Sequence, residues 1–205
     1  MRFVLFVEGY TEDKALPAFL KRWLDRRLDS PVGIQTVRFE GWSELVRDVA
    51  QKARMHLKGP SKDKTIAVIS LLDLYGPTFY PNHLKDKGER YNWAKRYIEG
   101  KVGEGRFYQF FAVHEVEAWL LSRPEIFPPP IRESLQGRVA RPEDVNSDTP
   151  PAKLLDTLYR QHTKRPYKKV TNGKDLFQKL DPSEAYSKCP RLKEMLDKML
   201  ELARG

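Results

Sequence analysis

The chain has 205 residues, which is enough for one domain with a sizeable core. Hydrophobic residues make up 40% of it and charged residues 32%, which is typical of a folded globular protein and excludes a disordered one. The apolar runs are too short to cross a bilayer, and the N-terminus does not resemble a signal peptide. The single cysteine, Cys189, excludes an internal disulfide and a cysteine-based zinc cluster. We therefore expect a cytoplasmic protein with no membrane partner.

The charge balance favours a polyanionic partner. The chain carries 37 basic and 28 acidic residues, a formal net charge of +9. Among polyanions, nucleic acid is the commonest partner of such a protein, although many basic proteins bind none.

Strand and helix signals alternate over the first 123 residues, which predicts a mainly parallel sheet with helices on its faces. Four short runs rich in β-formers are the expected strands, at residues 2–7, 34–39, 65–72 and 107–113. The third run is apolar at nearly every position, as a strand covered on both faces must be. Helices are expected after a Thr11 cap, where Glu12 and Asp13 suit the helix dipole, and at residues 42–57, 93–98 and 115–121.

The character of the sequence changes at Pro128, the first of three successive prolines. Short helices are expected beyond it, at residues 152–159, 175–180 and 190–202, with no strand signal. We predict an α/β domain over residues 1–127 and a helical extension over residues 128–205, packed on it as one structural unit. The sequence leaves the oligomeric state open.

Acidic residues follow the predicted strands. Glu8 comes after the first strand, Asp73 after the third, and Glu115 and Glu117 after the fourth. Ligands of open parallel sheets bind beyond the carboxyl ends of the strands, and Mg²⁺ prefers oxygen ligands. The pattern therefore indicates a metal site; the alternative is that these acids only cap helix N-termini. Gly9 is expected to let the backbone turn sharply beside a ligand.

The run from Val7 to Glu12, followed by Leu16, Pro17, Phe19 and Leu20, resembles the opening of TOPRIM domains, especially those of overcoming-lysogenization-defect type nucleases. The ordered motifs of the whole chain resemble the bacterial family catalogued as domain of unknown function 4276. These motifs are Val7 to Glu12, Leu72 to Gly76, His114 to Ala118, Pro142 to Asn146, Pro151 to Lys153, and Cys189-Pro190. The resemblance implies a TOPRIM/Rossmann-like four-stranded fold, a metal-dependent nuclease role in bacteria, and an ATPase partner in anti-phage defence.

One position departs from the TOPRIM pattern. A second aspartate is expected two residues after Asp73, where this chain has Tyr75. A phenol, with a pKa of about 10, is a poor ligand for magnesium. Glu115 or Glu117 can supply the missing oxygen, and we favour Glu117. His114 is then a supporting or proton-transfer group, or alternatively a buried histidine bonded to backbone.

The nuclease hypothesis gives each of these residues a role. Glu8, Asp73 and Glu117 hold Mg²⁺ or Mn²⁺, and Glu12 is an auxiliary ligand or base. Lys153 stabilises charge on the phosphate, or is a solvated helix lysine. Asp144 and Asn146 match turn or capping positions and are assigned no chemistry.

The stretch from Tyr159 to Lys174 is rich in basic residues and contains no acidic residue. Tyr159 and Tyr167 interleave with its cations, which suits phosphate contacts combined with base stacking. A solvated basic loop is the alternative. The predicted nucleic-acid-binding residues are Arg160, Lys164, Arg165, Lys168, Lys169 and Lys174.

Three functions follow. The first is a Mg²⁺- or Mn²⁺-dependent nuclease. The second is a non-catalytic module that binds nucleic acid or an ATPase, for which Tyr75 is the best argument. The third is a phosphohydrolase with a small phosphorylated substrate, since the same metal site serves it.

Overall fold

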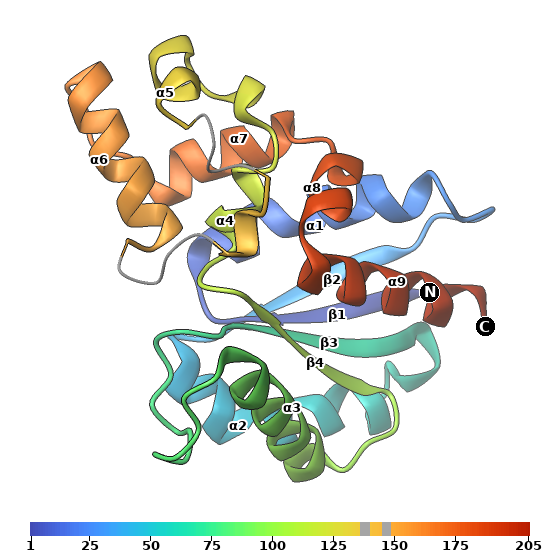
Figure 1. The fold of residues 1–205 in the computed structure, drawn as a ribbon. Helices are drawn as coiled ribbons and strands as arrows, with labels where there is room; N and C mark the ends of the chain where they lie inside the picture. The colour runs from blue at the N-terminus through green and yellow to red at the C-terminus, as the bar shows by residue number, and fades with distance from the viewer. Residues whose placement is uncertain (136–139, 145–148) are drawn as a thin grey trace.

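Four parallel strands form the centre of the protein (Figure 1). The computed structural model describes residues 1–135, 140–144 and 149–205. Strand β1 (Arg2–Val7) pairs with β2 (Gly33–Arg38) and β3 (Thr65–Asp73), and β4 (Phe107–Ala112) pairs with β3, so the order is β2-β1-β3-β4. Every pair is parallel, which confirms the predicted sheet. All four carboxyl ends therefore lie at one edge, which we call the carboxyl edge.

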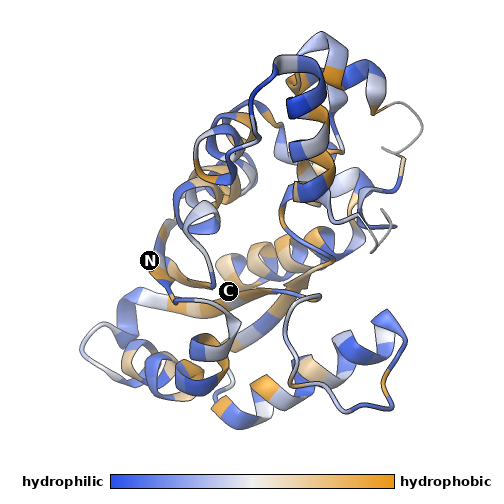
Figure 2. Cartoon of the chain, turned by 90° about the vertical axis from the view of Figure 1, so that its left-hand side faces the viewer, coloured by the Kyte–Doolittle hydropathy of each residue, from blue (hydrophilic) through white to orange (hydrophobic). Residues whose placement is uncertain are grey.

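Helices cover both faces of the sheet. Helix α1 (Tyr10–Asp25) lies on one face, and α2 (Trp42–Lys58) and α3 (Lys87–Val102) lie on the other (Figure 1). Strand β1 alternates between two cores: Phe3 and Leu5 join the α1 side, while Val4 and Phe6 join the α2–α3 side. This double burial explains why the central strands β1 and β3 are largely apolar, whereas the edge strand β2 and the helices carry both polar and apolar residues (Figure 2).

Two helix starts differ from the sequence-based expectation. Helix α1 begins earlier, with Gly9 as its N-cap, so Thr11 lies inside the helix and the prediction that Thr11 caps it was wrong. Helix α3 extends well beyond residues 93–98 because Asp86 caps it, accepting hydrogen bonds from the Gly88 and Glu89 amides at 2.7 and 3.0 Å. It ends where Gly103 adopts a left-handed conformation.

The C-terminal residues form helices, several of which pack on α1, and the last of which also packs on β3 and β4. Rings from three elements meet there, with Phe19 of α1 5.4 Å from Phe177 and 6.3 Å from Trp119. The described elements after β4 are α4 (Glu117–Leu120), α5 (Pro129–Ser134), α6 (Pro151–Thr163), α7 (Lys174–Lys179), α8 (Pro182–Lys188) and α9 (Pro190–Arg204), with 3₁₀ turns at Pro124–Ile126 and Pro142–Asp144 and a π-helical turn at Lys169–Gly173. A further 3₁₀ turn, Lys62–Lys64, precedes β3. Helices α5 and α8 were not foreseen individually.

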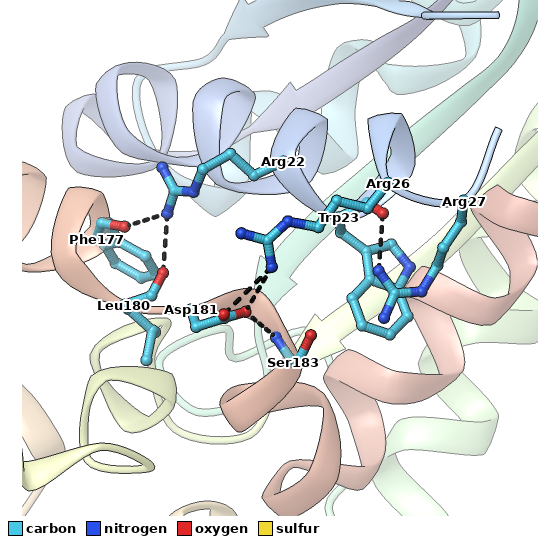
Figure 3. Close-up of polar contacts among 8 residues, drawn as sticks. All are labelled: Arg22, Trp23, Arg26, Arg27, Phe177, Leu180, Asp181 and Ser183. Atoms are coloured by element: carbon cyan, nitrogen blue, oxygen red, sulfur yellow. Dashed lines mark hydrogen bonds and ion pairs between the residues drawn. The ribbon is translucent and has the colours of Figure 1, made fainter. Parts of the chain in front are cut away.

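Polar contacts add to this packing (Figure 3). The Arg22 guanidinium donates to the carbonyl oxygens of Phe177 and Leu180 at 2.7 and 2.9 Å, which satisfies backbone acceptors at the end of α7. Arg26 forms a 3.2 Å ion pair with Asp181, the N-cap of α8. The extension is therefore joined to α1 by core and polar contacts, while its boundary at residue 127 stays a prediction. Among the described residues, no helix is long and apolar enough to span a membrane.

Candidate functional site

Carboxylates gather at the carboxyl edge. Glu8 follows β1, Asp73 ends β3, and Glu117 begins α4 just after β4. The Glu8 carboxylate accepts a 2.8 Å hydrogen bond from the Asp73 amide, which fixes these two residues against each other. Glu12, in the first turn of α1, and Glu115 complete a set that we call the acidic cluster.

Burial and mutual repulsion disfavour ionisation of this cluster. Burial, opposed by the Asp73 amide and reinforced by Glu12, raises the pKa of Glu8 to about 7. Burial raises the pKa of Glu117 to about 7, and this side chain is only 1% exposed. Burial and the charges of Glu8, Glu12 and Glu117 raise the pKa of Asp73 well above its usual range. These raised pKa values mean that the positive charge near the carboxylates is too small to offset their burial and mutual repulsion.

Lys169 supplies part of that charge. It begins the π-helical turn, and its ammonium lies 2.6 Å from Glu115 and 3.9 Å from Glu117. Although burial lowers the pKa of Lys169, the two carboxylates outweigh burial and raise it, so the side chain stays charged. The structure thus places Lys169 in the acidic cluster, apart from the basic segment in which the sequence had grouped it.

Glu115 and Glu117 differ in what they contact. Besides Lys169, Glu115 accepts a 2.9 Å hydrogen bond from the Ala152 amide in the first turn of α6, so it ties the extension to the sheet. By contrast, Oε1 of Glu117 is buried without a hydrogen-bond partner among the described residues. A buried and unpaired carboxylate oxygen is costly, which suits a ligand position better than a structural one.

Gly9 makes room for Glu12. A Cβ atom at position 9 would lie 2.3 Å from Oε2 of Glu12, so any larger residue displaces that carboxylate. The backbone of Gly9 is extended, with φ −137°. The chain bends at Glu8 and Gly9 as expected, but this bend does not require a glycine conformation, and the small residue instead leaves space for Glu12.

Tyr75 and His114 stack on each other beside the cluster. Their ring centroids are 4.6 Å apart and the rings are inclined by 9°. His114 is 5% exposed and adopts the left-handed conformation, with φ 69°. Because it precedes α4, it does not share a helical face with Glu117. Burial and the charge of Lys87 lower the pKa of His114, which favours its neutral form.

The other sequence-predicted cations lie on the extension. Lys153 is exposed on α6, one residue after Ala152, whose amide bonds to Glu115. Lys164 ends α6 in a left-handed conformation, and Arg160 pairs with Asp156 at 2.8 Å. Arg165 and Lys168 line a surface hollow of about 560 Å³. These residues and Lys174 are exposed, as an interface requires.

The two tyrosines of this segment do not suit base stacking. Tyr159 is 8% exposed and Tyr167 is 7% exposed, and both belong to the core on the α1 side. The prediction that they stack on bases was wrong, because both rings are buried in this core and have little surface left for a base.

Two of the sequence motifs meet for structural reasons. Glu143 accepts hydrogen bonds from the Arg191 and Leu192 amides at 2.9 and 3.3 Å, so it caps α9 directly after Cys189 and Pro190. Asp144 pairs with Lys87 at 2.6 Å, in keeping with a turn residue. Asn146 lies outside the described residues.

The donor atoms of the acidic cluster are of the type that a hard divalent cation prefers. They are carboxylate oxygens, one of them buried without a hydrogen-bond partner within the described ranges, and burial and mutual repulsion raise the pKa of Asp73 among them. Among residues 1–135, 140–144 and 149–205, however, no three His, Cys, Asp or Glu side chains lie close enough together to hold a metal ion. With Lys169 in its present position the carboxylates are neighbours but do not converge on one point.

The raised pKa values predict how stability depends on pH. Between about 4.5 and 7, the folded protein holds protons on Glu8 and Glu117 that the unfolded chain has lost. The contribution of these groups is therefore fully present at the acidic end and is lost as pH rises through about 7, by roughly 1–3 kcal/mol for each group. Thermal unfolding in chelator across this range checks it. The Glu8→Gln/Glu117→Gln protein should show a flatter profile, and an equally steep one contradicts the assignment.

The fold and the cluster together define a class of protein: a four-stranded parallel α/β domain with an acidic cluster at its carboxyl edge and a helical extension closing over one side. The chain belongs to the family described as Domain of unknown function (DUF4276), whose model matches residues 7–200.

Solved structures with a similar fold come from two bacteria. The C-terminal region of the Burkholderia pseudomallei OLD protein matches with 17% identity and a TM-score of 0.48, covering 98% of each chain. The C-terminal region of the Xanthomonas campestris pv. campestris OLD protein matches with 16% identity and a TM-score of 0.41, covering 100% of this chain and 98% of that one. No curated protein matches the chain.

Proposed function

We propose that this protein is a nuclease of TOPRIM type that depends on Mg²⁺ or Mn²⁺, with the acidic cluster as its active site. The observation that carries the proposal is the set of buried and half-buried carboxylates from three strand ends, balanced at close range by the Lys169 ammonium. A protein of net charge +9 that maintains such a cluster is suited to bring a polyanion and a cation together.

Each side chain has a role in this proposal. Glu8, Asp73 and Glu117 hold the cation, and Glu12 accepts a proton or adds a ligand. When bound, the metal polarises the phosphate and makes water a better nucleophile. Lys169, already inside the cluster, stabilises charge on the phosphate, and we propose it for this role ahead of the exposed Lys153.

The remaining proposed residues position these groups or the strand. Glu115 keeps Lys169 and α6 in place, and His114, stacked on Tyr75, supports the edge. The exposed cations of the extension, Arg160, Lys164, Arg165, Lys168 and Lys174, contact the nucleic-acid backbone. Work with an ATPase partner in bacterial defence is part of the proposal through the family resemblance.

The stacking of Tyr75 on His114 favours a second candidate, a non-catalytic module that binds nucleic acid or an ATPase. Tyr75 stands where TOPRIM enzymes have their second aspartate, and the stack gives that ring a packing role. The third candidate, a small-molecule phosphohydrolase, differs from the first only in the size of its substrate.

Calorimetric titration of Mg²⁺ and Mn²⁺ tests the proposal, followed by incubation of each sample with plasmid DNA. We expect the wild type to bind metal and to nick the plasmid, and Glu8→Ala to lose both. A wild type that binds no metal and leaves the plasmid intact establishes the non-catalytic module. Metal binding without nicking, together with hydrolysis of a small phosphate ester, establishes the phosphohydrolase.

A further inference from the structure

Five aromatic side chains from three separate segments gather beside the carboxyl edge, on the α2–α3 side of the sheet. We call them the aromatic platform: Trp42, Phe79, Tyr80, Trp93 and Tyr97. Trp42 begins α2, the next two lie in the loop after β3, and the last two lie on α3 (Figure 1). The ring of Phe79 is at the centre, 4.7 Å from Tyr80 and 5.9 Å from each of the other three.

Most neighbouring rings of the platform are stacked or tilted, and one pair, Tyr80 and Trp93, meets edge-on at 62°. Trp93 and Tyr97 are 4.9 Å apart and inclined by 9°, and Phe79 is inclined to its four neighbours by 25° to 38°. Neighbouring pairs in the core beneath meet edge-on, as Tyr91 and Phe111 do at 67°. Flat stacking leaves ring faces at the ends of the stack, whereas edge-on packing consumes them.

The platform is open to solvent at its outer end. Tyr97 is 45% exposed although Trp93 covers one face of its ring. Trp42, Phe79, Tyr80 and Trp93 are partly buried and rest on the core, so the surface is held in place before any ligand arrives. A rigid, partly exposed aromatic stack binds another planar ring at little cost in conformational entropy.

The platform adjoins the acidic cluster through one short connection. The Tyr80 hydroxyl donates to the carbonyl oxygen of Leu74 at 2.8 Å, and Leu74 directly follows Asp73. Cations border the same surface: the Arg90 guanidinium lies 5.5 Å from the Tyr80 ring, and Arg96 is exposed on α3. Ring faces, flanking cations and a nearby phosphate site are the features by which proteins hold single strands.

We propose that the aromatic platform stacks unpaired bases of a nucleic-acid strand whose phosphate lies at the acidic cluster. The inference rests on the proposed function and deepens it, since it names a single strand or a locally unpaired end as the substrate class. A base can stack on Tyr97 only after it has left its own duplex, so the platform discriminates against fully paired DNA.

Binding of a fluorescein-labelled oligothymidylate strand, followed by anisotropy in chelator and low salt, tests the proposal. The wild type should bind the strand more tightly than a duplex of equal length. Tyr97→Ala should weaken strand binding roughly 10- to 100-fold, because stacking contributes that much per base, and Tyr97→Phe should restore it. Circular dichroism establishes that each variant is folded.

Tyr186→Ala is the matched control, since Tyr186 also stacks on a tryptophan, Trp23, at 4.3 Å but on the opposite side of the sheet. It should bind the strand as the wild type does. Strand binding that is equal in Tyr97→Ala and the wild type overturns the proposal and leaves the platform as a protein-docking surface. A preference for duplex overturns it too.

The two proposals fail separately. The anisotropy is measured without metal, so strand binding that depends on Tyr97 can coexist with a plasmid that stays intact. That outcome contradicts only the proposed nuclease activity. Conversely, metal-dependent nicking together with strand binding that is unchanged in Tyr97→Ala contradicts only the proposed role of the aromatic platform.

Discussion

Replacement of Glu117 by glutamine is expected to abolish the response of the protein to divalent metal and, in chelator, to raise its free energy of unfolding. The side chain is 1% exposed, one of its oxygens has no hydrogen-bond partner in the part of the chain that the structure describes, and burial raises its pKa to about 7. Glutamine keeps the shape and removes the charge that must be buried above that pH. The gain is expected to be roughly 1–3 kcal/mol at about pH 8.

Urea unfolding of the wild type and Glu117→Gln, with chelator and with Mn²⁺, measures both effects. In the wild type, saturating metal should add about 3 kcal/mol at a hundredfold excess over the dissociation constant, and in the variant it should add nothing. Glu133→Gln, at an exposed position on α5, is the control and should match the wild type. A Glu117→Gln protein that is less stable in chelator and still stabilised by metal means that Glu117 is structural.

Replacement of Lys169 by methionine is expected to act in the opposite direction on stability. Without its ammonium, Glu115 loses a 2.6 Å ion pair and Glu117 loses its nearest cation. Because Lys169 is half-exposed, the expected loss in chelator is modest, about 1–2 kcal/mol. Metal should bind more tightly, since it no longer competes with a tethered cation, while plasmid nicking should fall about 100-fold.

Lys153→Met is the matched control, because the sequence had pointed to Lys153 for the same role. Calorimetry and nicking assays on the two variants decide between the lysines. Loss of nicking in Lys153→Met, with Lys169→Met active, returns the role to Lys153. Lys169→Arg should keep the stability in chelator, because it keeps the charge.

The sequence was informative where local patterns carry the structure. Apolar runs and their spacing predicted four strands and a parallel sheet, because a strand buried on both faces must be apolar at nearly every position. Parallel strands align their carboxyl ends, so acids that follow Val7 and Leu72 were expected to meet, and the Asp73 amide does bond to Glu8. Helix ends were less predictable, since the Asp86 cap lies seven residues before the expected start of α3.

The site itself depended on contacts between distant segments. Lys169 lies 54 residues beyond Glu115 in the chain, and only the folding of the extension over the carboxyl edge brings its ammonium there. The same packing buries Tyr167, which the charge pattern had assigned to an interface. Residues in one stretch of sequence thus face opposite ways, and composition does not encode that direction.

What the sequence by itself determined is the sheet, its carboxyl edge and the acids that follow its strands, because these follow from periodicity and from the geometry of parallel strands. The tertiary structure alone decided which glutamate has a buried oxygen without a hydrogen-bond partner among the described residues, which lysine enters the cluster, and that Trp42, Phe79 and Trp93 share one surface. These depend on how side chains from remote elements pack, and the free energy of that packing is a property of the assembled core.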